Sequence, residues 1–203
     1  MINKRTVFLF LTAMILSFAS YAQSKKTVID YLSLPGPIVF DSKSYNLSWT
    51  SHPSANYYKQ EYILSGDDVV KFKTMIMVEV VTGDIKIKDA VAAKIAELKK
   101  MKESNPIVNY ESFDNPKTGE YMIDFLLSEN TADGKSISIA ERNVYRYMPF
   151  VGKDGKKGVI LFGVSTRSYG DKIQQFLASL KSNKSELVNK LAQYKFPELK
   201  IIK

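Results

Sequence analysis

Residues 107–166 read IVNYESFDNPKTGEYMIDFLLSENTADGKSISIAERNVYRYMPFVGKDGKKGVILFGVST and contain the clearest strand pattern of the chain. Short polar turns divide it into runs that are rich in β-branched and aromatic residues. The runs are 107–113, 121–127, 136–148 and 159–166. The turns carry Asn115-Pro116, Asp133-Gly134 and Asp154-Gly155, which favour tight hairpins. We therefore expect four strands that are antiparallel neighbours.

More strands are predicted upstream. Runs 38–40 and 44–49 flank a short polar turn and predict a hairpin, in which alternation places Tyr45, Leu47 and Trp49 on one packed face. A loop follows at 51–54. Further strands are expected at 56–64 and 74–81, with a short helix at 67–72 between them.

The helical segments are fewer. Residues 89–103 show an apolar stripe of Val91, Ile95 and Leu98 at helical spacing. The chain ends helically from 173 to about Pro197, with a restart at Asn183. Strands with segregated helices indicate an α+β protein. We expect a single antiparallel β-sheet of about six to seven strands flanked by helices.

The N-terminus has the parts of a secretory signal. Lys4 and Arg5 precede a short apolar run, and small residues stand before a predicted cut after Ala22. We expect a signal peptide at 1–22, a tether at 23–36 and one domain at 37–203. The protein is then exported, to a bacterial periplasm or beyond, with no transmembrane segment in the mature chain.

The composition limits the partners. Losing Lys4 and Arg5 with the signal lowers the net charge from +8 to +6, and the excess lysines are scattered among acids. Nucleic-acid binding needs clustered positive charge, so it is not expected. The chain has no Cys, which excludes disulfides.

The chain offers little for catalysis. It has one His, His52, whereas a zinc site needs about three protein ligands, mostly His or Cys. Gly152-Lys-Asp-Gly-Lys-Lys-Gly158 lacks the order of a phosphate-binding loop and precedes a strand. We therefore expect no catalytic residue, no metal and no cofactor. The alternative that stays open is a small hydrolase or isomerase that uses His52 with Glu61 or Asp67.

Two aromatic and charged tracts are candidates for binding. One runs from Tyr57 to Tyr62, beside His52, and the other from Arg142 to Tyr147. If their strands are neighbours, they form an aromatic-basic patch. The candidate binding residues are His52, Tyr57, Tyr58, Lys59, Glu61, Tyr62, Arg142, Tyr145, Arg146 and Tyr147. The alternative is that they form ordinary sheet surface, in which Tyr is common.

The order of elements resembles the Mog1/PsbP-like α/β/α sandwich. Tyr45-x-Leu-x-Trp49, followed by the Tyr57–Tyr62 tract and Gly66-Asp67, is similar to small bacterial exported proteins. The resemblance implies an adaptor, assembly factor or chaperone-like binder, although fold alone does not determine function. The leading hypothesis is an exported, non-enzymatic module that binds an unknown protein or envelope component. A polyanion or membrane-surface binder is a further alternative.

Overall fold

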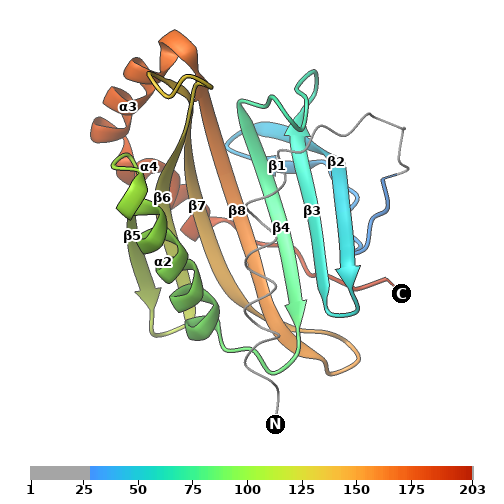
Figure 1. Cartoon of the computed structure of the whole chain (residues 1–203). Coiled ribbons are helices and arrows are strands. Elements are labelled where there is room, and N and C mark those ends of the chain that lie inside the picture. Colours follow the sequence, from blue (N-terminus) through green and yellow to red (C-terminus); the bar gives the residue numbers. More distant parts are fainter. Residues whose placement is uncertain (1–27, 203) are drawn as a thin grey trace.

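One antiparallel sheet organises the computed structural model, which describes residues 28–202 (Figure 1). The sheet has eight strands in the order β1-β2-β3-β4-β8-β7-β6-β5. They are β1 (Ile38–Phe40), β2 (Lys43–Ser54), β3 (Tyr57–Leu64), β4 (Thr74–Thr82), β5 (Asn109–Asn115), β6 (Glu120–Asn130), β7 (Ile137–Val151) and β8 (Lys157–Tyr169). The α+β class is confirmed. The expected count of six to seven was low, because all eight of the predicted runs join the sheet, including the short β1 and the polar β5 at its two edges.

The sheet consists of two meanders that meet at its centre. Strands β1 to β4 pair in sequence order, and so do β5 to β8. The meanders join where β4 pairs with β8, from Thr74 opposite Thr166 to Thr82 opposite Gly158. Helix α2 (Ile87–Ser104) carries the chain from the central β4 to the far edge at β5.

The two faces of the sheet are covered differently. On one face, here called the α2 face, α2 packs against β5, β6 and β7 (Figure 1). On the opposite face, here called the C-terminal face, α4 (Lys184–Gln193) packs against β7. The 3-10 turn η1 (Gly170–Lys172) and α3 (Ile173–Ser182) connect β8 to α4. Among residues 28–202, no helix combines the length and apolar character needed to cross a membrane.

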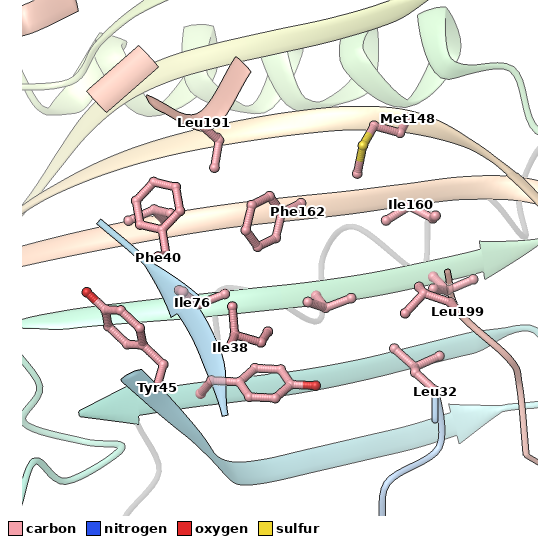
Figure 2. Close-up of a cluster of buried hydrophobic side chains, with 14 of the residues drawn as sticks. Leu32, Ile38, Phe40, Tyr45, Ile76, Met148, Ile160, Phe162, Leu191 and Leu199 are labelled. Atoms are coloured by element: carbon pink, nitrogen blue, oxygen red, sulfur yellow. The ribbon is translucent and has the colours of Figure 1, made fainter. Parts of the chain in front are cut away.

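The larger core lies on the C-terminal face (Figure 2). The Phe162 ring stacks on Tyr194 with 4.9 Å between ring centroids, and Phe40 meets Phe162 edge-on. Leu191 of α4 and Leu199 of the tail complete this core. A large apolar side chain buried in this way contributes about 1.5–3 kcal/mol, so the C-terminal segment is an integral part of the fold.

Residues 28–36, expected to be part of a tether, lie against the C-terminal face. Leu32 is completely buried. The backbone N–H groups of Tyr31 and Leu32 donate to the side-chain oxygen of Gln60, at 2.7 and 3.1 Å. The tail pairs with the same segment, because Lys200 and Ile202 donate to the carbonyls of Leu32 and Tyr31. The expected signal peptide at 1–22 lies outside the described residues.

The helix predicted at 67–72 does not form. The carboxylate of Asp68 accepts the backbone N–H of Val70 at 2.7 Å, and that of Asp67 accepts the N–H of Lys73 at 3.2 Å. These local bonds hold the segment as a turn, which is how Asp competes with helix formation.

A β-bulge in β2 overturns the predicted face of Trp49. Leu47 pairs with Tyr62 and Trp49 pairs with Glu61, so the register shifts between them. The extra residue turns Trp49 to the opposite face from Leu47. Tyr45 and Leu47 pack into the C-terminal core as expected, whereas Trp49 is 40% exposed.

Candidate functional site

The Tyr57–Tyr62 tract forms β3, and its side chains alternate between the two faces. Tyr58, Gln60 and Tyr62 point to the C-terminal face and are buried there. Tyr57, Lys59 and Glu61 point to the α2 face and keep partial exposure. Of the predicted tract, only these three side chains share a partly open surface.

Trp49 and Glu79 join these three side chains. Lys59 Nζ lies 2.8 Å from a Glu61 oxygen and 3.8 Å from Glu79 Oε1. The same nitrogen lies 5.7 Å from the centre of the Trp49 ring. We call these five residues, Trp49, Tyr57, Lys59, Glu61 and Glu79, the outer half-face.

The outer half-face lies beyond the reach of α2. In Figure 1 α2 lies in front of β5–β7, and no described helix lies in front of β2–β4. At one end of these strands the loop after β3 folds over this face, where Phe72 packs on Ile63 and Met75. The outer half-face is therefore bordered by this loop and by α2.

Glu79 is the unusual member of the outer half-face. The residue is only 8% exposed, yet its Oε1 has no hydrogen-bond partner within the described part of the chain. Burial raises the pKa of Tyr57, and the Glu79 charge raises it further. The pKa of Tyr147 is also raised by burial and then by Glu79. The Glu79 charge thus raises the pKa of tyrosines on both sides of β4, Tyr57 in β3 and Tyr147 in β7.

The two arginines of the second tract hold the C-terminal helix α4 onto the sheet. Arg142 forms two bonds to the Asp124 carboxylate, at 3.0 and 2.8 Å, and donates to the Lys184 carbonyl at the start of α4. Its side chain and that of Asp124 are both buried.

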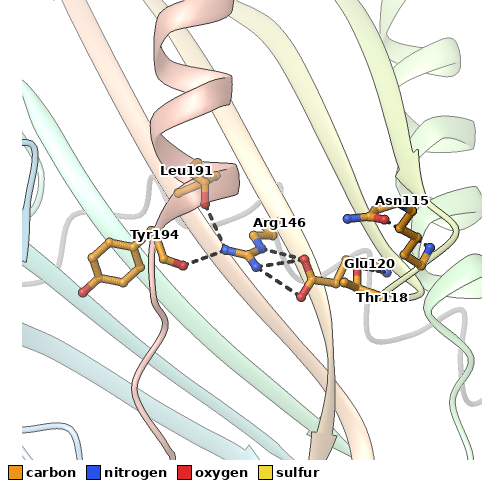
Figure 3. Close-up of polar contacts among 7 residues, drawn as sticks. Asn115, Thr118, Glu120, Arg146, Leu191 and Tyr194 are labelled. Carbon is orange, nitrogen blue, oxygen red and sulfur yellow. Dashed lines mark hydrogen bonds and ion pairs between the residues drawn. The ribbon is translucent and has the colours of Figure 1, made fainter.

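Arg146 does the same at the end of α4 (Figure 3). It donates to both oxygens of Glu120, at 2.9 and 3.1 Å, and to the carbonyls of Leu191 and Tyr194, at 3.0 and 2.8 Å. The guanidinium groups of both arginines are occupied by these structural contacts.

The two tracts do not meet in one patch. Strands β4 and β8 lie between β3 and β7, which places the tracts about 14 Å apart at normal strand spacing. Tyr145 and Tyr147 lie on the α2 face but are buried in its core, with Tyr145 edge-on to Phe125 at 4.8 Å. The condition for an aromatic-basic patch, neighbouring strands, is therefore not met, and the two tracts lie in separate environments.

His52 lies within β2 and not in the expected loop, because the strand continues past a second register shift to Ser54. Its ring stacks on Tyr58 with 4.2 Å between centroids. Its Nδ1 is 2.9 Å from the Tyr57 carbonyl oxygen. Tyr58 belongs to the C-terminal face, whereas Glu61 points to the α2 face. The sheet thus separates His52 from Glu61, its suggested partner.

Asp67, the other suggested partner of His52, lies beyond the opposite end of β3. Its carboxylate is engaged by the Lys73 N–H. In residues 28–202 no three His, Asp or Glu side chains gather as a metal-binding set.

The comparison with known families is informative over most of the chain. One family model matches residues 32–196. The chain belongs to that family. No curated protein and no solved structure matches it. The resemblance to the Mog1/PsbP-like sandwich stays a prediction, and family membership brings no activity with it.

The family match includes the whole outer half-face, and two of its residues were missed as candidates. Trp49 was assigned to a packed face, since simple alternation reads through the bulge. Glu79 is the only charged residue in the β4 sequence TMIMVEVVT. A single carboxylate within an apolar strand is the signal that could have identified Glu79 from the sequence.

Proposed function

We propose that the protein is an exported, non-enzymatic module that binds a protein, peptide or other component of a bacterial envelope. The outer half-face is its binding surface. Export is inferred from the signal-like pattern of residues 1–22. The binding role is inferred from the surface and from the way in which the other candidate residues are used.

The bulge at Trp49 is the observation that carries the proposal. It turns the single Trp of the chain, 40% exposed, toward Lys59 and Glu61. An extended strand without the bulge would bury this ring beside Leu47. Trp and Tyr beside charged groups are typical of the residues that dominate protein interfaces.

The surroundings of His52 favour binding over catalysis. A catalytic histidine base is typically oriented by a hydrogen-bonded third group, and the carboxylates suggested for His52 lie on the other face or at the other end of β3. The ring contacts a backbone carbonyl and Tyr58. These contacts give it a structural role at the edge of β2.

The test compares capture of envelope components by matched variants. The full-length protein, tagged at its C-terminus and expressed in its own host, is isolated from the envelope fraction, where we expect a chain that begins at Gln23. A Trp49→Ala change should weaken retention of its partner at least tenfold, as hot-spot residues do. The control is Val70→Ala, because Val70 is also exposed but lies in the loop after β3.

Two results would contradict the proposal. One is equal retention of the same partner by the Trp49→Ala and Val70→Ala proteins. The other is a chain found in the cytoplasm with its first residues intact.

A further inference from the structure

We infer that the outer half-face binds a protonated amine, which the Glu79 carboxylate accepts beside the Trp49 ring. This inference rests on the proposed function and names the ligand chemistry of the same surface. It follows from three properties of the surface: its charge balance, an acceptor oxygen without a hydrogen bond, and its aromatic ring.

The charge balance of the outer half-face is negative. It contains two carboxylates, Glu61 and Glu79, and one ammonium group, on Lys59. Lys59 lies nearer to Glu61, at 2.8 Å, than to Glu79, at 3.8 Å. Lys59 therefore compensates mainly the charge of Glu61, and the charge of Glu79 is compensated less.

One oxygen of Glu79, Oε1, also lacks a hydrogen-bond donor among residues 28–202. Buried carboxylate oxygens are nearly always bonded, because leaving one without a partner is costly. Within the described chain, Oε1 of Glu79 has no such bond and only the 3.8 Å ion pair with Lys59, although the residue is more than nine-tenths buried. It points to the side on which Lys59 and Glu61 lie, since β3 and β4 pair Lys59 opposite Glu79. A ligand that fits must donate a hydrogen bond there.

The ring of Trp49 selects among the possible donors. The negative face of an indole attracts cations, and Lys59 already lies 5.7 Å from its centre. A ligand ammonium satisfies the acceptor, the charge balance and the ring together. A neutral hydroxyl satisfies only the acceptor, and an anion is repelled by both carboxylates. The ligand class is therefore a lysine side chain, an N-terminal amine or a small alkyl amine.

The single Trp provides a direct readout of this site. The full-length protein is titrated with 1,5-diaminopentane while Trp49 fluorescence is recorded, and 1-pentanol serves as the uncharged comparison. We expect a saturable change with the diamine and none with the alcohol. The Glu79→Gln change keeps the shape and removes the charge, so it should weaken binding at least tenfold. Glu129→Gln, at an exposed carboxylate of β6, should bind as the unchanged protein does.

Several results would overturn the inference. They are equal responses of the Glu79→Gln and unchanged proteins, an equal response to pentanol, or no response to the diamine. If circular dichroism shows that Glu79→Gln does not fold, Glu61→Gln provides the same test, because it removes the other carboxylate. Amide shifts of Lys59 and Glu79 in NMR spectra give a readout that is independent of the indole.

The outcome separates this inference from the proposed function. Retention of an envelope partner that depends on Trp49, together with no amine response, would reject the ligand class and leave the binding surface in place. An amine response without any partner retained through Trp49 would reject the module function and keep the site.

Discussion

Arg146 connects three parts of the chain with one side chain. It bonds the carboxylate of Glu120 in β6 and two carbonyls at the end of α4, while it is itself part of β7. The exposed fractions of the Arg146 and Glu120 side chains are 12% and 20%. In such surroundings an arginine stabilises mainly by preventing its partners from being left without bonds.

Replacing Arg146 by Met should therefore be costly. Glu120 would keep a partly buried charge without a partner, and the Leu191 and Tyr194 carbonyls would lose the bonds from Arg146. We expect the free energy of unfolding, measured by urea denaturation, to fall by about 3 kcal/mol.

The matched control is Lys153→Met, because its ion pair with Glu198 has side-chain exposures of 66% and 71%. That change should stay within about 0.5 kcal/mol. Similar losses in the two variants would show that Arg146 does not hold α4 to the sheet.

At the scale of elements, Gln60 fastens the segment 28–36 to β3. Its oxygen accepts from Tyr31 and Leu32, and its amide nitrogen donates to the hydroxyl of Tyr62 and the carbonyl of Leu34. One buried amide thus satisfies backbone groups of this segment that the C-terminal tail does not bond.

A Gln60→Leu change should release this segment before the sheet unfolds. The Tyr31 N–H would lose its acceptor, whereas the Leu32 N–H keeps a 3.1 Å bond to the Asp30 carboxylate. A donor left without an acceptor costs about 1–3 kcal/mol, so hydrogen exchange at the Tyr31 amide should become at least tenfold faster. Hydrogen exchange of amides in the centre of β7 should change less than that of Tyr31. The control is Thr50→Val, which removes only a 3.4 Å exposed contact with Ile29. Unchanged exchange at Tyr31 would contradict this role.

Much of the element pattern could be predicted from local sequence, and the exceptions have physical causes. Asp133-Gly134 and Asp154-Gly155 mark turns whose backbone needs a positive φ, and both glycines have one, 68° and 78°. The bulge beside Trp49 was not predictable. The residues 44–49 still alternate between apolar and polar, so the sequence pattern does not reveal the extra residue in the strand. The turn at Asp68 defeated the helix prediction, because a carboxylate serves equally well at a helix start and in a turn.

The candidate site was predictable only in part, for a similar reason. Alternation along β3 correctly grouped Tyr57, Lys59 and Glu61. The roles of Arg142 and Arg146 depend on carbonyls of α4 that lie far along the chain. Main-chain acceptors of this kind leave no mark in a sequence pattern.

At the scale of the whole molecule, buried tyrosines make the fold sensitive to alkali. Burial raises the pKa of Tyr62, Tyr145 and Tyr147, and nearby carboxylates raise those of Tyr145 and Tyr147 further. In the unfolded chain these phenols ionise near pH 10. The folded protein holds its protons more tightly, so unfolding releases protons above that pH.

The free energy of unfolding should therefore be insensitive to these groups below about pH 9 and fall above about pH 10. Each such tyrosine contributes about 1.4 kcal/mol per pH unit to the decline. Urea denaturation between about pH 8 and 11 measures the slope. A Tyr145→Phe change should reduce the slope by the share of one tyrosine. An identical slope in that variant would contradict the assignment.

The seam between β4 and β8 has a consequence for how fast the protein folds. Each meander forms by closing short turns, which costs little chain entropy. Joining the two meanders requires residues near 78 and 162 to meet across the intervening helix and strands. Contacts so distant along the chain slow folding. The central pair of strands is therefore expected to be the last to assemble.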